Sequence, residues 1–233
     1  MSTGGVVKRL WCDLERLALA QDCALCGAPS ADRVLCAGCC ADLPALAESC
    51  PRCALPSPGG TACGACLAAP PHFDRTIAAW RYDFPCDRLI HRLKYRARLP
   101  IAGFLAETLA PRISSRVDCV VPMPLHRERL AERGFNPAVE IARALVARTG
   151  GRLATGASRR VRHTAPQAEL PLDERAANVR GAFACAPDLR GKRVAVVDDV
   201  MTTGTTLDEL ARALKAAGAS MVENWVVART LLD

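Results

Sequence analysis

The sequence has no uninterrupted apolar stretch of the roughly 18 residues that a membrane-spanning helix needs, although half of its 233 residues are apolar. It also lacks the pattern of a secretory signal peptide at its start. Residues Met1 to Leu19 instead mix charged and apolar side chains in a way that predicts a short amphipathic helix. We therefore expect a cytoplasmic protein without a membrane span.

Acidic residues are scarce relative to basic ones, and the imbalance lies in one part of the chain. Residues 1–72 contain five Lys and Arg against six Asp and Glu, whereas residues 73–233 contain twenty-six against eighteen. A basic excess of this kind favours polyanionic ligands, either diphosphates or nucleic acid.

Eight of the thirteen cysteines form a duplicated unit with the spacing C-x2-C-x9-C-x2-C. Each cysteine of the first unit recurs 27 residues later in the second. Cysteine-rich secreted chains are often disulfide scaffolds, but paired Cys-x-x-Cys motifs ahead of an enzyme-like domain favour metal binding. The expected metal ligands are Cys23, Cys26, Cys36, Cys39, Cys50, Cys53, Cys63 and Cys66.

Four thiolates per unit satisfy the tetrahedral preference of zinc and leave no open position for catalysis, so we expect two structural zinc ions. Neither unit has enough apolar residues to fold without metal. One zinc per unit closes shorter loops than an interleaved arrangement, although both are possible. Cys40 stands beside Cys39, but the 27-residue register favours Cys39 as the ligand. The remaining cysteines are expected to be small buried hydrophobes, namely Cys12, Cys86, Cys119 and Cys185.

The segment 194–206, VAVVDDVMTTGTT, predicts a buried parallel strand, two acids at its carboxyl end, a Thr/Gly loop and then a helix. Open α/β sheets bind ligands at the carboxyl ends of their strands, and a loop before a helix start attracts phosphate. Asp198 and Asp199 would repel a phosphate but accept hydrogen bonds from a ribose diol, or hold a divalent ion through water. A ribose 5-phosphate fits both features, because its hydroxyls suit the acid pair and its phosphate suits the loop. The alternative is an ordinary strand, turn and helix with N-capping threonines, which explains neither the acid pair nor Gly204.

The middle of the chain predicts a strand over Ile77 to Tyr82 and a helix over Asp87 to Tyr95. The densest basic run of the sequence begins within this helix, extends just beyond it and contains no acid. It is either a solvated face or a contact surface for nucleic acid or phosphate, with a tyrosine available to stack on a base. The residues are Arg88, Arg92, Lys94, Tyr95, Arg96 and Arg98.

A second buried strand is expected over Asp118 to Leu125, ending in the rigid sequence Pro122-Met123-Pro124. A helix is expected over Phe135 to Leu145. The polar stretch from Arg159 to Arg180 is either a disordered insertion or a lid over a charged ligand. His163 lies in this stretch, where ligand contact or exposure is a commoner role than that of a catalytic base.

Residues 194–206 resemble the 5-phosphoribosyl diphosphate (PRPP) motif of type I phosphoribosyltransferases. The resemblance implies that Asp198 and Asp199 bind the ribose hydroxyls. It also implies that the 5-phosphate is held by the loop of Met201, Thr202, Thr203, Gly204, Thr205 and Thr206. The segment Pro122, Met123 and Pro124 resembles the loop that contacts the diphosphate in that family. Magnesium would accompany PRPP, and Arg127, Arg129 and Arg133 could neutralise diphosphate charge.

The cysteine-rich start, the phrase RGFN at 133–136, Thr164-x-x-Gln167, the sequence NVRGAF at 178–183 and the PRPP motif together resemble the ComF family. This resemblance implies an α/β, type I phosphoribosyltransferase-like, Rossmann-type fold with a mainly parallel sheet. The expected domains are an N-terminal helix with a double zinc ribbon (1–72) and the phosphoribosyltransferase-like domain (73–233).

The ComF resemblance implies a PRPP- and magnesium-binding protein linked to DNA uptake in natural transformation, with other DNA-uptake proteins as partners. One alternative is a non-catalytic factor that binds single-stranded DNA through contacts including Arg133 and Arg162, and uses the pocket as a nucleotide or PRPP sensor. Another is a purine or pyrimidine salvage phosphoribosyltransferase. No conventional hood for an acceptor base is found in the sequence, and no catalytic side chain is assigned.

Overall fold

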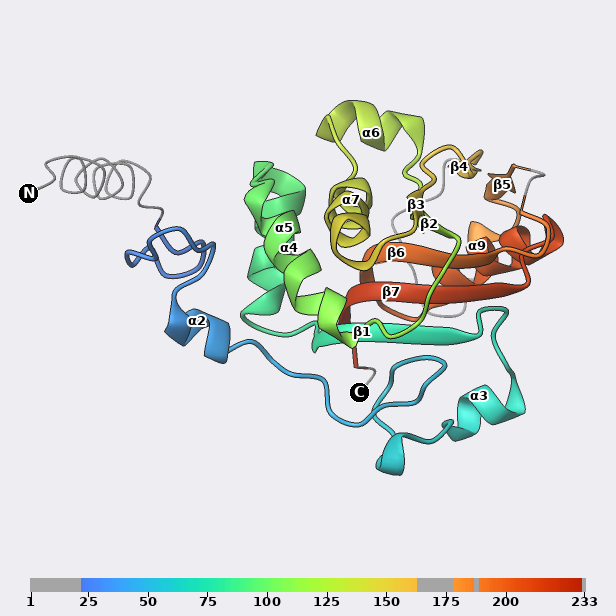
Figure 1. Ribbon diagram of the computed structural model, residues 1–233, viewed down its shortest axis with the longest axis horizontal. Coiled ribbons are helices and arrows are strands. Elements are labelled where there is room, and N and C mark those ends of the chain that lie inside the picture. The colour runs from blue at the N-terminus through green and yellow to red at the C-terminus, as the bar shows by residue number, and fades with distance from the viewer. Residues whose placement is uncertain (1–21, 163–177, 187–188, 232–233) are drawn as a thin grey trace, which may run out of the picture.

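The computed structural model describes residues 22–162, 178–186 and 189–231 (Figure 1). The expected N-terminal helix from Met1 to Leu19 and Cys12 lie outside these ranges. Within them, no helix combines the length and the apolar character that crossing a bilayer requires.

The central sheet has five strands in the order β1, β7, β6, β2, β3, and all neighbouring strands are parallel. The strands are β1 (Arg75–Arg81), β2 (Cys119–Pro122), β3 (Arg152–Leu153), β6 (Arg193–Met201) and β7 (Met221–Arg229). Val194 to Val197 in β6 are fully buried, as the apolar run predicts. Because the strands are parallel, their carboxyl ends meet at one edge of the sheet.

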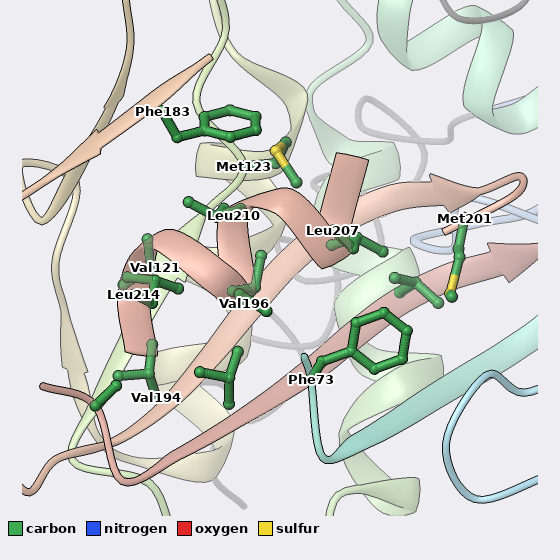
Figure 2. Packing of buried hydrophobic residues seen from close by; sticks show 14 of the residues in the cluster. Phe73, Val121, Met123, Phe183, Val194, Val196, Met201, Leu207, Leu210 and Leu214 are labelled. Atoms are coloured by element: carbon green, nitrogen blue, oxygen red, sulfur yellow. The ribbon is translucent and has the colours of Figure 1, made fainter. Parts of the chain in front are cut away.

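Helices cover both faces of this sheet, and side chains alternate between the two faces along β6. Ala195 and Val197 pack against α4 (Cys86–Arg96), α5 (Pro100–Leu109) and α7 (Pro137–Thr149). Val194 and Val196 face α9 (Thr205–Ala216), whose residues Leu207, Leu210 and Leu214 point toward them (Figure 2). The expected helices are therefore present as α4 and α7.

Shorter elements complete the domain. The helix α6 (Arg127–Arg133) separates β2 from α7, and η2 (Ala110–Arg112) follows α5. A separate antiparallel pair is formed by β4 (Ser158–Arg160) and β5 (Phe183–Cys185). The strand expected over 118–125 is shorter than predicted, because it ends at Pro122, the first proline of the rigid loop.

The cysteine-rich segment consists of two copies of one small motif. The helix α2 (Ala37–Ala41) recurs as α3 (Gly64–Ala68), with η1 (Pro58–Gly60) before it. The β-bridge from Asp22 to Pro29 recurs between Ser49 and Pro56. Each of these features is displaced by the 27 residues that separate the cysteines, so the sequence repeat is a structural repeat.

The segment between the two cysteine units runs along the exposed edge of β1. The backbone N–H of Arg81 donates to the carbonyl of Pro44 at 2.9 Å, and the N–H of Thr76 donates to the carbonyl of Pro51 at 3.0 Å. The second unit therefore lies beside β1, the edge strand of the sheet (Figure 1).

Candidate functional site

The eight paired cysteines form two groups of four, one in each unit. Within each group the sulfur atoms lie within 4.8 Å of one another. The separation between Cys26 Sγ and Cys36 Sγ is 3.7 Å, and that between Cys53 Sγ and Cys63 Sγ is 3.6 Å. These values are close to the edge of about 3.8 Å for a tetrahedron with zinc–sulfur bonds of about 2.3 Å. The donor sets therefore fit structural zinc, with one ion per unit.

The group includes Cys39, as the 27-residue register predicts, and leaves Cys40 exposed outside it. Burial opposes ionisation of Cys50, but backbone N–H groups, including that of Cys63, outweigh it and lower the pKa of this thiol to about 6. The remaining described cysteines behave as core residues: Cys86 and Cys119 are fully buried, and Cys185 is half-buried.

Asp198 and Asp199 lie near the carboxyl end of β6, as the sequence predicts. The N–H of Asp199 donates to Asp198 Oδ1 at 2.9 Å. Burial, together with the neighbouring carboxylate of Asp199, raises the pKa of Asp198 to about 7. The pair therefore concentrates negative charge that a hydroxyl-rich or cationic ligand would stabilise.

Lys94 reaches this acid pair from α4. Its Nζ lies 2.7 Å from Asp199 Oδ1 in an ion pair that is largely buried. Burial opposes the lysine charge, but the adjacent Asp199 outweighs it and raises the pKa of Lys94. The basic run around Lys94 did not reveal this contact, because the acid partner lies more than a hundred residues away along the chain.

The loop after β6 brings the chain directly into α9. Gly204 is the N-cap residue of α9 and has a left-handed backbone with φ of 85°. This positive φ favours glycine, and a Cβ atom would stand 2.6 Å from Met201 Cε, so that a larger residue would also have to displace the end of that side chain. Since Gly204 occupies the N-cap, no threonine takes that role. The N–H groups of Thr203 and Gly204 have no acceptor among the described residues.

A cavity of about 760 Å³ joins the acid pair to this loop. This volume lies in the upper part of the range of about 300–1,000 Å³ for small-molecule sites. Its walls include the last turns of α4, the loop after β2, the turn between α6 and α7, and β4. Met123 lines this cavity, whereas Pro122 and Pro124 line a neighbouring one of about 1,000 Å³.

Two arginines of the cavity wall lie near the acid pair: Arg129, which the sequence predicts as a neutraliser of diphosphate charge, and Arg160, which it did not single out as a ligand contact. Arg160 comes from β4 and Arg129 from α6, and both line the cavity with Asp198. Burial lowers the pKa of Arg160, as does the nearby Arg129, while Asp198 opposes the change. Two cations thus converge at the end of the cavity that faces the acid pair.

Asn136 of the phrase RGFN fixes the loop after β2. Its Nδ2 donates to the carbonyl of Met123 at 2.9 Å, and its Oδ1 accepts from the N–H of Ala138 as the N-cap of α7. One side chain therefore links the start of α7 to the cavity wall. The N-cap geometry could have been read from Asn136-Pro137, but not the contact with Met123.

The basic run does not form one continuous face. Arg92 donates to the carbonyl of Ala24 in the first cysteine unit, and Lys94 points into the cavity. Arg88, Arg96 and Arg98 are exposed.

Tyr95 is exposed at the cavity rim. Its ring lies 4.6 Å from that of His91, and the Arg133 guanidinium stands over it at 5.4 Å. Arg162 is exposed and donates to the carbonyl of Arg180. His163, Thr164 and Gln167 lie outside the described residues, so the predicted lid stays a prediction.

Two family descriptions match the chain. A phosphoribosyl transferase domain covers residues 130–231, and a double zinc ribbon domain covers residues 14–67. Among solved structures, glutamine PRPP amidotransferase from B. subtilis is similar with a TM-score of 0.38 and 23% identity, over 53% of this chain and 25% of that one. A purine phosphoribosyltransferase from Pyrococcus horikoshii is similar with a TM-score of 0.30 and 22% identity, over 66% of this chain and 78% of that one.

Curated relatives are more similar in sequence. DNA utilization protein YhgH from Salmonella typhi is 35% identical over 170 residues, which span 70% of this chain and 75% of the relative. Competence protein F from Haemophilus influenzae is 31% identical over 170 residues, 68% of this chain and 74% of the relative. The chain belongs to the ComF family and has a type I phosphoribosyltransferase fold with an N-terminal double zinc ribbon.

Proposed function

We propose that the cavity binds the ribose 5-phosphate part of PRPP together with Mg²⁺. The observation that carries this proposal is the order of groups around one cavity: open backbone N–H groups at a helix start, an acid pair beside them, and two arginines beyond. In PRPP the 5-phosphate would meet the N–H groups, the ribose diol the acid pair, and the diphosphate the arginines.

The 5-phosphate fits the loop between β6 and α9. The N–H groups of Thr203 and Gly204 are available as donors, and the positive end of the α9 dipole adds a favourable field. The hydroxyls of Thr203 and Thr205 hydrogen-bond to each other at 2.8 Å, which leaves one hydroxyl proton as a further donor.

The ribose hydroxyls fit Asp198 and Asp199, whose carboxylates accept hydrogen bonds. Asp198 also suits a cation, since burial and the Asp199 carboxylate raise its pKa and the nearby Lys94 and Arg160 offset this only in part. Mg²⁺ prefers carboxylate oxygen, phosphate oxygen and water, so Asp198 with the ligand's own diphosphate would hold it and neutralise phosphate charge. Lys94 holds the Asp199 carboxylate in place through their ion pair at 2.7 Å.

The diphosphate fits the arginine end of the cavity. Arg160 and Arg129 are held close to each other although both are cations, and a polyanion would relieve that repulsion. The loop at Met123 closes this side of the cavity, and Asn136 holds it in place.

A transfer reaction in this cavity requires no nucleophilic side chain. The acceptor forms a bond to C1 of the ribose as the bond from C1 to the diphosphate oxygen breaks, and diphosphate leaves with the electron pair. The acceptor's proton passes to water or to the leaving group. The protein contributes orientation of the ribose through the acid pair and stabilisation of the departing charge through the arginines.

The names of the relatives extend the proposal to a biological role. The names of YhgH and competence protein F refer to DNA utilization and to competence. We therefore propose that this protein acts in the cytoplasm on DNA that the cell has taken up. The basic excess of residues 73–233 suits such a partner.

A second function, single-stranded DNA binding at the cavity rim, is favoured by Tyr95. This ring is 66% exposed and lies between His91 and Arg133. An exposed aromatic ring beside an arginine is a stacking platform for a base of any sequence. In this case the cavity would sense PRPP or a nucleotide, without transfer.

Calorimetric titration of the zinc-loaded protein with PRPP and Mg²⁺ tests the pocket. The double variant Asp198→Ala, Asp199→Ala should abolish binding, whereas the exposed control pair Asp32→Ala, Asp42→Ala should leave it unchanged. Binding that survives loss of the acid pair would refute the assignment.

Diphosphate release from PRPP, measured across a panel of nucleobases and amines, separates transferase from sensor. For the DNA function, Tyr95→Ala should weaken oligonucleotide binding, and affinity should fall steeply with salt. A flat salt response would exclude phosphate contacts by the basic residues.

A further inference from the structure

Arg229, the last residue of β7, joins the second zinc unit to the loop after β6. Its side chain is 1% exposed, which is rare for a cation without a fixed set of partners. The guanidinium donates to four backbone carbonyls. Its Nε donates to the carbonyl of Cys53 at 2.7 Å. The two N–H groups of Nη1 are shared among the carbonyls of Met201 at 3.0 Å, Thr230 at 2.7 Å and Thr202.

Two of these acceptors set the direction of the loop. In a trans peptide unit the carbonyl and the following N–H point to opposite sides. When Arg229 holds the carbonyls of Met201 and Thr202, the N–H groups of Thr202 and Thr203 face away from the guanidinium. That is the side on which the cavity lies, since Thr202 and Gly204 line it.

The other anchor of Arg229 is a zinc ligand. Cys53 provides both a sulfur atom to the second cluster and the carbonyl that accepts from Arg229 Nε. Four thiolates around Zn²⁺ leave a net charge of about −2, and a buried guanidinium beside them compensates part of it. Charge and hydrogen bonding therefore both hold Arg229 against the loaded cluster.

Apolar contacts also join the second zinc unit to the loop after β6. Cys50, Cys53 and Cys66 belong to one buried cluster with Phe73 and Met201. Phe73 and Met201 lie beneath the start of α9 (Figure 2), and Met201 Cε occupies the space that a side chain on residue 204 would need. The first zinc unit has no such contact. In the described residues it is joined instead to α4: Ala24 and Leu35 share a buried cluster with Ile90, and Arg92 donates to the carbonyl of Ala24.

We propose that Arg229 is a positioning residue through which the second zinc site orients the phosphate-binding loop. Zinc in the second site, but not in the first, then controls the order of residues 202–206 and the affinity for a ribose phosphate. The part concerning affinity rests on the proposed function, whereas the part concerning loop order does not.

The experiment has two readouts on the full chain. Amide hydrogen exchange of residues 202–206, measured by mass spectrometry without ligand, reports loop order. Calorimetric titration with PRPP and Mg²⁺ reports affinity, and metal analysis on the same samples reports zinc content. The variants are Arg229→Lys, with the exposed Arg193→Lys as control, and Cys66→Ser, with its repeat counterpart Cys39→Ser.

Arg229→Lys should retain both zinc ions, exchange faster in the loop and bind PRPP about tenfold more weakly, because an ammonium cannot reproduce the guanidinium fork. Cys66→Ser should empty the second site and loosen the loop. Cys39→Ser should empty the first site and leave loop exchange as in the unmodified chain.

Equal loop exchange in Arg229→Lys and Arg193→Lys would overturn the proposal, as would equal effects of Cys66→Ser and Cys39→Ser on the loop. If Arg229→Lys does not fold, the comparison of Cys66→Ser with Cys39→Ser still tests whether the second zinc site orders the loop. If the unmodified protein binds no PRPP, the proposed function fails, and the exchange measurement still tests the control of the loop by zinc.

Discussion

Replacing Asp198 by asparagine should stabilise the unliganded protein while weakening its ligand binding. The pKa of Asp198 is raised to about 7, so its ionisation in the folded state is opposed by burial and by Asp199. An acid whose pKa moves from 3.8 to about 7 costs the folded state about 4 kcal/mol once ionised, at about 1.4 kcal/mol per pH unit. Because the side chain is only half-buried at the cavity floor, solvent screening reduces this to about 2 kcal/mol.

The sign of the effect follows from proton binding. Below pH 4 the carboxyl group is neutral in both states and no penalty exists. As the pH rises from about 4 to 7, the unfolded chain releases this proton before the folded chain does, so stability is lost through that window. Asparagine has no proton to lose. The advantage of Asp198→Asn should therefore be about 2 kcal/mol at pH 8 and about half as large at pH 5.5.

Urea denaturation of the zinc-loaded proteins at the two pH values measures this difference. Other titrating groups, including the zinc thiolates, are common to both chains and cancel. The opposite control is Asp199→Asn, which leaves the Lys94 ammonium without its ion-pair partner and should be destabilising at both pH values. Two results would refute the conclusion that burial and Asp199 oppose ionisation of Asp198. One is an Asp198→Asn variant that is no more stable than the unmodified protein at pH 8, and the other is an advantage that does not shrink at pH 5.5.

Three further outcomes follow from the structure. Lys94→Met should cost about 3 kcal/mol of stability in thermal or urea denaturation, because Asp199 loses its buried cation. Gly204→Ala should be more destabilising than Gly134→Ala by about 1–2 kcal/mol in the same assay, since both glycines have positive φ but a Cβ meets Met201 only at residue 204. Metal analysis should give two zinc ions per chain, and a chelator that removes both should unfold the cysteine-rich segment in circular dichroism.

The local sequence was sufficient to predict the elements with strong periodicity. The β6 strand was identified from its continuous apolar run and α9 from apolar residues at helical spacing, and the 27-residue register gave the two groups of cysteines that the structure brings together. The PRPP motif located the acid pair and the loop because all their residues are adjacent in the chain.

What the sequence could not provide were contacts between distant segments. The pairing of Lys94 with Asp199 and the bonds of Arg229 to Cys53 and Met201 depend on how the sheet brings α4, β6 and the second zinc unit together. Lys94 was included in a basic run, where a solvent-facing role is the usual outcome. Arg160 was hidden in a polar stretch, since nothing local distinguishes it from Arg159.

The two copies of the cysteine unit have the same backbone but different surroundings. In the second copy Cys50, Cys53 and Cys66 are all buried, whereas in the first copy Cys26 is exposed and Cys36 and Cys39 are half-buried. Solvent, chelators and oxidants thus reach the first copy more easily. We therefore expect oxidative or metal-poor conditions to remove zinc from the first copy before the second.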